Sequence, residues 1–345
     1  MRLLVTGHHG YIGSVVAPML NDAGHEVVGL DTFYYEGCDL GTVEFPFEER
    51  RADVRDVGPD DLEGVDAVVH LAALSNDPLG DLSSDWTYDI NLRGTLHVAR
   101  TAKKVGVKRF VFFSSCSMYG AAEDGASLDE HAPLLPLTAY AESKVHAEQG
   151  LAELADDGFS PVSLRNATAY GASARLRVDV VLNNLVGWAF TTGRIKLLSD
   201  GTSWRPIVHV EDIGRATLAV LEAPRDEIHD SAFNVGATAE NYQIRDLAEI
   251  VHGCLPECDV ELAEASYSDP RSYRVHFSKL EHAFPNRRPV WTARAGTEEL
   301  VQAYAENGLS EEGFHSYRYT RLKQIRRLLD EGRLDDTLRW RPRAR

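Results

Sequence analysis

The sequence of 345 residues has few cysteines, no long apolar run and no excess of positive charge. The spacing of its four cysteines (Cys38, Cys116, Cys254 and Cys258) does not form a disulfide framework, and the last two have too few companions for a zinc site. No apolar run approaches the roughly 20 residues of a membrane span, and the first residues enter a strand pattern without the apolar core of a signal peptide. We therefore predict a cytoplasmic protein with reduced thiols, no metal site and no membrane partner.

The charge balance excludes a further class of partner. Lys and Arg together number 36 against 53 for Asp and Glu, which gives a net charge of −17. Binding to DNA, RNA or anionic lipid needs basic patches that offset the phosphate charge. A chain of this length can bury a substantial core, so we predict a globular protein that acts on a small molecule and not on a nucleic acid.

Short apolar runs alternate with helical patterns through the first two thirds of the chain. This alternation predicts an α/β fold, a doubly wound parallel sheet with helices on both faces. The predicted strands are Arg2–Thr6, Glu26–Leu30, Ala67–Leu71, Arg109–Phe113, Pro161–Arg165, Ile207–Val210 and Phe233–Val235. The predicted helices are Ile12–Ala23, Thr87–Val105, Tyr140–Ala155, Leu176–Thr192 and Ile244–Val251, and the apolar spacing after Glu311 predicts one amphipathic helix that packs on the core.

A glycine-rich loop lies between the first predicted strand and the first predicted helix. It reads VTGHHGYIG, with Gly7, Gly10 and Gly13 spaced three apart. Glycines let a backbone approach a pyrophosphate closely, and the N-terminus of the helix supplies unpaired N–H groups and a partial positive charge. By itself the pattern also fits an ordinary strand-to-helix turn.

Asp31 ends the second predicted strand, 18 residues after Gly13. A carboxylate at this point accepts both ribose hydroxyls of NAD and repels the 2′-phosphate of NADP. The next residues, Thr32 and Phe33, offer no arginine to compensate. The sequence therefore predicts NAD as the cofactor, and a reductase that consumes NADPH is disfavoured but stays open.

Further motifs follow along the chain in a fixed order. They are Asp53-Val54, HLAAL from His70, NLRGT from Asn91, SSCSMYG from Ser114, YAESK from Tyr140 and WRPIVHVEDI from Trp204. Together with the glycine loop and Asp31, this set resembles the extended short-chain dehydrogenases/reductases, in their nucleotide-sugar epimerase/dehydratase branch. The resemblance covers nearly the whole chain.

The resemblance implies a Rossmann-type fold with two interleaved parts. We predict an NAD-binding domain over residues 1–172, to which 205–236 return, and a smaller α/β substrate lobe over 173–204 and 237–345 that includes a C-terminal helical tail. It also implies a homodimer, in which helices near Asn91–Val105 and Tyr140–Ala155 pair into a bundle.

Tyr140 and Lys144 are four residues apart on a helical pattern, so they share one face of the helix. A sugar hydroxyl that is oxidised must lose a proton. Free tyrosine, with a pKa of about 10, is too weakly ionised to accept it at neutral pH unless a nearby cation favours the phenolate. By resemblance, Tyr140 is the general base and acid, Lys144 assists it and binds the nicotinamide ribose, and Ser115 hydrogen-bonds the reacting oxygen.

The resemblance also assigns residues that bind the cofactor and the substrate. The predicted cofactor contacts are Gly7, Gly10, Tyr11, Ile12, Gly13, Asp31, Asp53, Val54, Leu71, Ala72, Ala73, Asn91, Ser114, Tyr140 and Lys144. The predicted substrate contacts are Ser75, Ser115, Thr168, Asn184, Arg205 and Arg271. Thr168 stands where many relatives have asparagine, so the identity of the sugar is left open, as is the nucleotide base.

The residues after Ser115 bear on the reaction. Dehydratases of this family carry Asp-Glu there, because eliminating water needs an acid and a base, whereas this chain has Cys116 and Ser117. Glu123 and Asp124 are near in sequence, but no motif places them. We predict epimerisation at C4 of a nucleotide-diphosphate hexose or heptose through a transient 4-keto sugar. A net 4-dehydrogenase or 4-ketoreductase, a 4,6-dehydratase and a non-catalytic NAD-binding regulatory module stay open.

Overall fold

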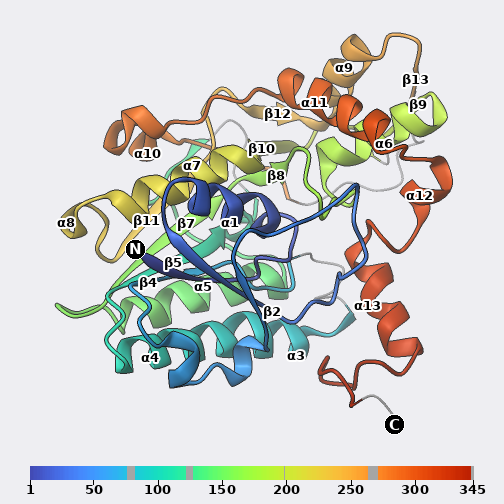
Figure 1. The fold of residues 1–345 in the computed structure, drawn as a ribbon. Coiled ribbons are helices and arrows are strands. Elements are labelled where there is room, and N and C mark those ends of the chain that lie inside the picture. Colours follow the sequence, from blue (N-terminus) through green and yellow to red (C-terminus); the bar gives the residue numbers. More distant parts are fainter. Residues whose placement is uncertain (76–81, 122–126, 198, 263–270, 343–345) are drawn as a thin grey trace.

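The computed structural model describes residues 1–75, 82–121, 127–197, 199–262 and 271–342. Its centre is a seven-stranded sheet in the order β11-β7-β5-β4-β1-β2-β3, with every neighbouring pair parallel (Figure 1). The strands are β1 (Arg2–Thr6), β2 (Glu26–Asp31), β3 (Glu48–Arg51), β4 (Ala67–His70), β5 (Arg109–Ser115), β7 (Ser160–Asn166) and β11 (Ser231–Val235). The α/β fold class predicted from the sequence is confirmed.

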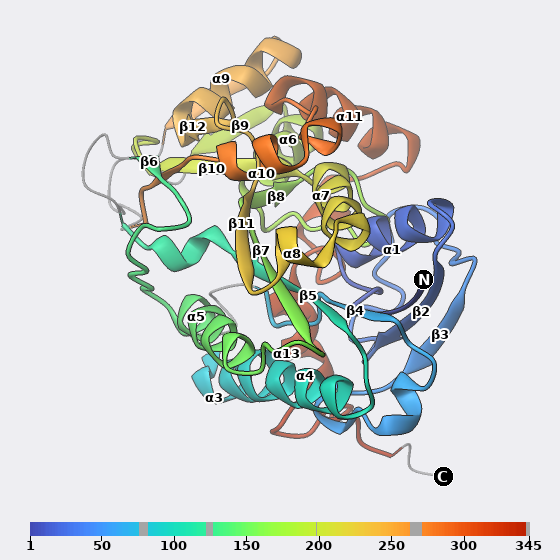
Figure 2. The same ribbon diagram turned by 90° about the vertical axis from the view of Figure 1, so that its left-hand side faces the viewer.

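Helices cover both faces of this sheet (Figures 1 and 2). On one face lie α1 (Gly13–Asp22) and α7 (Val210–Glu222), and on the other α4 (Thr95–Lys104) and α5 (Ala139–Ala152). Side chains alternate along a strand, so Leu3 of β1 belongs to the buried cluster with α1 and α7, and Leu4 to the cluster with α4 and α5. Both faces of the strands are therefore buried, which explains their nearly continuous apolar runs.

The predicted helix Thr87–Val105 is divided in the structure. A short helix α3 (Ser84–Thr87) leads into a π-helical segment η3 (Tyr88–Gly94), and regular helix resumes at α4. The predicted dimer would form at the side-by-side helices α4 and α5, and pairing of two chains remains a prediction. Within the described ranges, no helix has the length and apolarity needed to cross a membrane.

The remaining elements build a smaller lobe over the carboxyl ends of the large sheet (Figure 2). Its strands are β8 (Thr168–Tyr170), β10 (Trp204–His209) and β12 (Asn241–Gln243) in one sheet, with the pairs β9 (Arg194–Leu197) with β13 (Asp259–Leu262) and β6 (Ser127–Leu128) with β14 (Arg274–Val275). Helices α6 (Val181–Thr192), α9 (Ile244–Cys254) and α11 (Ala293–Glu306) share its core. The short helices are α8 (Arg225–Ile228), α10 (Ser278–Ala283), η1 (Val54–Asp56), η2 (Pro59–Leu62), η4 (Cys116–Tyr119) and η5 (Pro285–Arg287).

The chain passes between the two parts more than once. After β10, which pairs within the small lobe, α7 and β11 return to the large sheet. The predicted helix Leu176–Thr192 begins only at Val181, as α6. Residues 173–180 form an irregular segment, which leaves their side chains available to the space between the two parts.

The C-terminal tail differs from the single amphipathic helix that was predicted. It forms α12 (Glu311–His315) and α13 (Arg321–Asp330), separated by residues 316–320, of which the first, Ser316, is extended. The hydroxyl of Ser316 accepts a hydrogen bond from the N–H of Arg318 at 3.2 Å, a local bond that competes with helical pairing. Tyr317 is therefore exposed, while Ile325 and Leu328 of α13 are buried with α4 and α5, so the predicted packing on the core is retained.

Candidate active site

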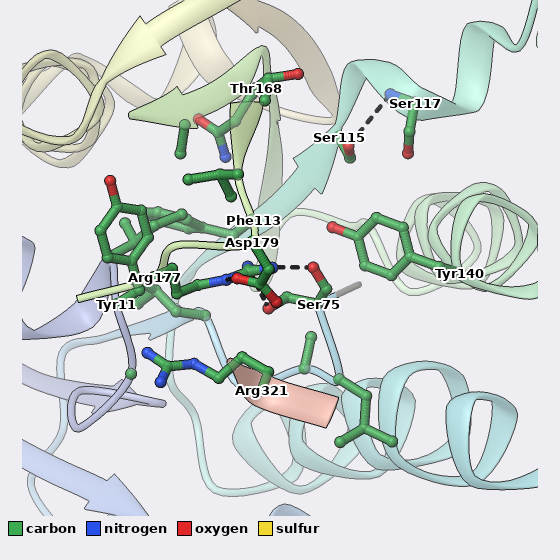
Figure 3. Close-up of a pocket in the computed structure, with 18 of the residues that line it drawn as sticks. Tyr11, Ser75, Phe113, Ser115, Ser117, Tyr140, Thr168, Arg177, Asp179 and Arg321 are labelled. Atoms are coloured by element: carbon green, nitrogen blue, oxygen red, sulfur yellow. Dashed lines mark hydrogen bonds and ion pairs between the residues drawn. The ribbon is translucent and has the colours of Figure 1, made fainter. Parts of the chain in front are cut away.

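A cavity of about 670 Å³ opens where the carboxyl ends of the strands meet the small lobe (Figure 3). It spans the point between β1 and β4 at which the strand order reverses, where open α/β sheets bind their ligands. Every site residue predicted from the sequence lines this cavity except Asn91. The motifs that lie far apart in the chain are therefore brought together.

The glycine loop after β1 is built so that only glycines fit. Gly7 has a φ of +78°, and a Cβ there would lie 2.7 Å from the backbone N of Ala72. A Cβ on Gly13 would collide with the carbonyl oxygen of Gly7. The backbone of the first turn of α1 is thereby open to a phosphate group, whose charge suits the N-terminus of a helix. These residues fit the diphosphate of NAD.

Asp31 lies at the carboxyl end of β2 and faces the cavity. Its oxygens accept hydrogen bonds from the backbone N–H groups of His9 and Phe33, at 3.1 and 2.7 Å. Burial raises the pKa of this carboxyl, and the His8 side chain and the two N–H groups oppose the shift. The carboxyl is thus held in place at the edge of the cavity, where its oxygens can accept hydrogen bonds from the hydroxyls of a ribose.

Two predicted cofactor contacts are engaged by the protein itself. Asp53 lines the cavity, but its carboxylate is held by Arg55, whose Nε and Nη2 lie 2.9 and 2.6 Å from its two oxygens. Asn91 is fully buried behind the cavity, and its amide exchanges two hydrogen bonds with the backbone of Leu74, at 2.8 and 3.0 Å. Asn91 therefore fixes the loop after β4 rather than lining the cavity.

Ser115, Tyr140 and Lys144 converge on one part of the cavity. Ser115 ends β5 and Tyr140 projects its hydroxyl inward from the first turn of α5 (Figure 3). Lys144 is buried beneath them, its Nζ 5.8 Å from the centre of the Tyr140 ring, and donates to the carbonyl oxygen of Phe113 at 2.7 Å. Burial lowers the pKa of Lys144 to about 7, although Glu148 opposes this. The arrangement can remove a proton from an oxygen held at Ser115 and Tyr140, and can return it.

Cys116 and Ser117 differ in where they face. Cys116 is fully buried outside the cavity lining, donates to the carbonyl oxygen of Arg165 at 3.1 Å, and has a thiol pKa raised well above its usual value by burial. Ser117 lines the cavity, and its N–H donates to Ser115 Oγ at 3.1 Å. Neither supplies a carboxyl group, and Glu123 and Asp124 lie outside the described residues.

The small lobe supplies the other half of the predicted substrate site. Arg205 of β10 donates to the carbonyl oxygens of Trp204, at 2.7 Å, and of Arg271. Asn184 of α6 donates to the carbonyl oxygen of Val178 at 2.8 Å. These side chains line the cavity and are held by backbone carbonyl groups.

Sequence reasoning missed four charged residues of the cavity: Arg177, Asp179, Lys196 and Arg321. Arg177 donates to Ser75 Oγ at 3.1 Å and pairs with Asp179 at 2.8 Å, as Figure 3 shows. The charges within the apolar stretch RLRVDVVL could have indicated Arg177 and Asp179 as cavity residues. The sequence prediction instead placed both of them in a helix that begins at Leu176. Arg321 carries no motif, and only the fold brings it to the cavity.

The parallel sheet, the glycine loop and the cavity at the switch point define a Rossmann-type, dinucleotide-binding protein. Residues 3–236 match the NAD dependent epimerase/dehydratase family. This chain therefore belongs to that family, which confirms the resemblance inferred from the motifs and the prediction of NAD as cofactor.

The individual relatives include both epimerases and a dehydratase. UDP-glucose 4-epimerase of Bacillus subtilis (strain 168) is 28% identical over 329 residues, which are 87% of this chain and 94% of that protein. UDP-glucose 4-epimerase of Corynebacterium glutamicum is 32% identical over 267 residues, 72% and 79% of the two chains. The solved structure of DesIV, a dTDP-glucose 4,6-dehydratase from Streptomyces venezuelae with NAD and TYD bound, gives a TM-score of 0.78 at 27% identity and covers 91% of this chain and all of that one (100%). Epimerase/dehydratase chemistry on a nucleotide sugar is thereby supported.

Proposed function

We propose that this protein inverts C4 of a nucleotide-diphosphate sugar, a hexose or heptose, through a transient 4-keto sugar. The observation that carries the proposal is the convergence of Ser115, Tyr140 and Lys144 beside the glycine loop, with Cys116 buried outside the cavity. The first part supports oxidation at a sugar hydroxyl. The second part supports a reaction that stops short of losing water.

The side chains divide the proton chemistry among them. Tyr140 accepts the proton of the C4 hydroxyl and later returns it to the C4 oxygen. Because Ser115 Oγ already accepts a hydrogen bond from the N–H of Ser117, its own proton can be donated to that oxygen. Lys144, when protonated, stabilises the phenolate. NAD, when bound, supplies a reversible hydride acceptor, so the cycle has no net oxidation or reduction.

Elimination would need a carboxyl group that is available to the sugar. Among the described residues lining the cavity, carboxyls come from Asp31, Asp53 and Asp179. Asp31 is held by two backbone N–H groups, and the other two are paired with Arg55 and Arg177. None of these pairings leaves an acid beside Ser115, and this supports an epimerase over a dehydratase.

The nucleotide end has candidate ligands of its own. Arg205, Arg271 and Asn184 line the cavity, and a guanidinium suits a diphosphate. Under the proposal they hold the diphosphate while the keto sugar turns over and presents its other face. UDP-glucose is the first substrate to test, because two relatives are named as its 4-epimerases.

The test is a turnover assay in heavy water. The purified protein is incubated with UDP-glucose and with a panel of GDP, ADP, CDP and dTDP sugars, and the products are read by mass spectrometry and NMR. The expected product has the mass of the substrate, inverted C4 and no deuterium on carbon, and the nicotinamide absorbance shows no net change.

Each alternative would give a different result. A dehydratase gives a product lighter by one water, and an epimerase at C3 or C5 takes deuterium from solvent. A dehydrogenase or ketoreductase changes the nicotinamide absorbance in proportion to product. No turnover on any sugar of the panel, with NAD bound, would favour the non-catalytic module. Loss of water would be the most damaging outcome, since it would mean that elimination proceeds without the carboxyl pair after Ser115.

A further inference from the structure

Arg321 reaches the cavity from a helix outside the stretch that matches the family. It is the first residue of α13, and its side chain lines the cavity (Figure 3). The side chain is only 3% exposed. Its Cζ lies 4.1 Å from the centre of the Tyr35 ring, and Nη2 donates to the carbonyl oxygen of Arg175 at 2.7 Å.

The other terminal nitrogen of this guanidinium has no acceptor. Nη1 of Arg321 is buried without a hydrogen-bond partner in the part of the chain that the structure describes. A buried cation with an unsatisfied N–H group is unfavourable. Burial accordingly lowers the pKa of Arg321, and Asp179, which is already paired with Arg177, opposes the shift. An anion that enters the cavity would satisfy both the nitrogen and the charge.

The position of Arg321 indicates which anion this is. Arg321 and Arg177 both act electrostatically on Tyr11, in the glycine loop, and on Tyr35, soon after Asp31. Arg177 is paired with Asp179, whereas Arg321 has no such partner among the described residues. Both guanidinium groups thus line the cavity together with Tyr11 of the glycine loop and with Tyr35, which lies against Arg321.

We propose that Arg321 binds the diphosphate of NAD and that the C-terminal tail thereby closes the cofactor end of the cavity. The tail also forms hydrogen bonds with residues that follow Asp31. Trp340 Nε1 donates to the carbonyl oxygen of Thr32 at 2.6 Å, and Gln324 Nε2 to that of Tyr34 at 2.9 Å. Because Thr32 and Tyr34 line the cavity beside Asp31, docking of the tail against them and binding of the cofactor would stabilise each other. The proposal rests on NAD as cofactor and not on inversion at C4.

Three variants of the full chain test this role. Arg321→Gln removes the charge, Arg321→Lys keeps it, and Arg326→Gln is the matched control because Arg326 is an exposed arginine on the same helix. Affinities for NAD, ADP-ribose and adenosine are measured by calorimetry on protein freed of nucleotide. Arg321→Gln should weaken NAD and ADP-ribose by about tenfold or more, as expected for a lost charged hydrogen bond. Adenosine binding should be unchanged, Arg321→Lys should be intermediate, and Arg326→Gln should match the wild type.

Two results would overturn the proposal. One is wild-type affinity of Arg321→Gln for ADP-ribose. The other is an equal loss for adenosine and ADP-ribose, which would mean that Arg321 only supports the fold. Hydrogen exchange on the wild-type chain tests the proposed diphosphate contact without a variant. ADP-ribose should slow exchange across 321–330 more than adenosine does, and equal protection by the two would contradict the proposed diphosphate contact.

Discussion

Replacing Lys144 by methionine should change how the stability of this protein depends on pH. The ammonium is 3% exposed, and the hydrogen bond that the structure gives it goes to the carbonyl oxygen of Phe113 at 2.7 Å. Burial lowers its pKa from 10.5 to about 7, which means that the folded state resists the charged form. In the unfolded chain the pKa returns to its ordinary value.

The sign of the effect follows from proton binding. Between pH 7 and 10.5 the unfolded chain holds a proton that the folded chain has released, so the free energy of unfolding rises with pH. Below pH 7 both states are protonated and the full cost of the buried charge is present. The slope approaches ~1.4 kcal/mol per pH unit. From pH 7 to pH 9 the wild type should therefore gain about 2 kcal/mol relative to Lys144→Met.

Urea unfolding of nucleotide-free wild type and Lys144→Met at pH 7, 8 and 9 measures this difference. Lys104→Met, at an exposed lysine of α4, is the control and should give a curve parallel to the wild type. The quantity compared is the difference in unfolding free energy between variant and wild type at each pH, which removes groups common to both. If the Lys144→Met and wild-type profiles were parallel, burial would not lower the pKa of Lys144 in the folded protein, and the reasoning from its position would be refuted.

Two further predictions concern catalysis and cofactor choice. Tyr140→Phe should lower turnover by about 10²–10⁴-fold while the purified protein keeps its bound nucleotide, since only the proton acceptor is lost; more than roughly a tenth of the wild-type rate would refute the assignment. Nucleotide released by denaturing the wild-type protein should have the mass of NAD. Asp31→Ala should reduce the ratio of the affinity for NAD to the affinity for NADP, because it removes the carboxyl that repels a 2′-phosphate. NADP as the main released species would contradict the reading of Asp31.

The residues that the sequence located well are those at the ends of strands. Asp31, Ser75 and Ser115 follow buried apolar runs, and parallel strands bring their carboxyl ends to one edge. The strand pattern therefore predicted the edge of the sheet at which they lie, whereas their roles came from the family resemblance and stay predictions. Asn91 was predicted to contact the cofactor, but its amide bonds to the backbone of Leu74 instead. A helical pattern does not reveal in which direction a side chain turns.

The features that escaped prediction depend on local bonds or on distant pairing. The helix predicted from Leu176 starts at Val181, which frees Arg177 and Asp179 for the cavity. The predicted tail helix is interrupted over residues 316–320, where the Ser316 hydroxyl bonds to the backbone of Gly313 and of Arg318, and no spacing rule detects such local bonds. Arg321 meets Tyr35 across the whole chain, and nothing in the residues around either one signals the contact.

Under the proposed reaction the cavity has to bind its ligands unequally. Inversion at C4 requires that the sugar turn over between two hydride transfers while the cofactor stays in place. The cofactor end offers the glycine loop, Asp31 and the buried Arg321, which together oppose release of NAD between the two steps. The sugar end offers short hydroxyl side chains, Ser75, Ser117 and Thr168, which give few contacts that would fix one face of a ring. The asparagine that many relatives have at position 168 is longer and has more donors, so Thr168 favours a sugar that can rotate over one that is clamped.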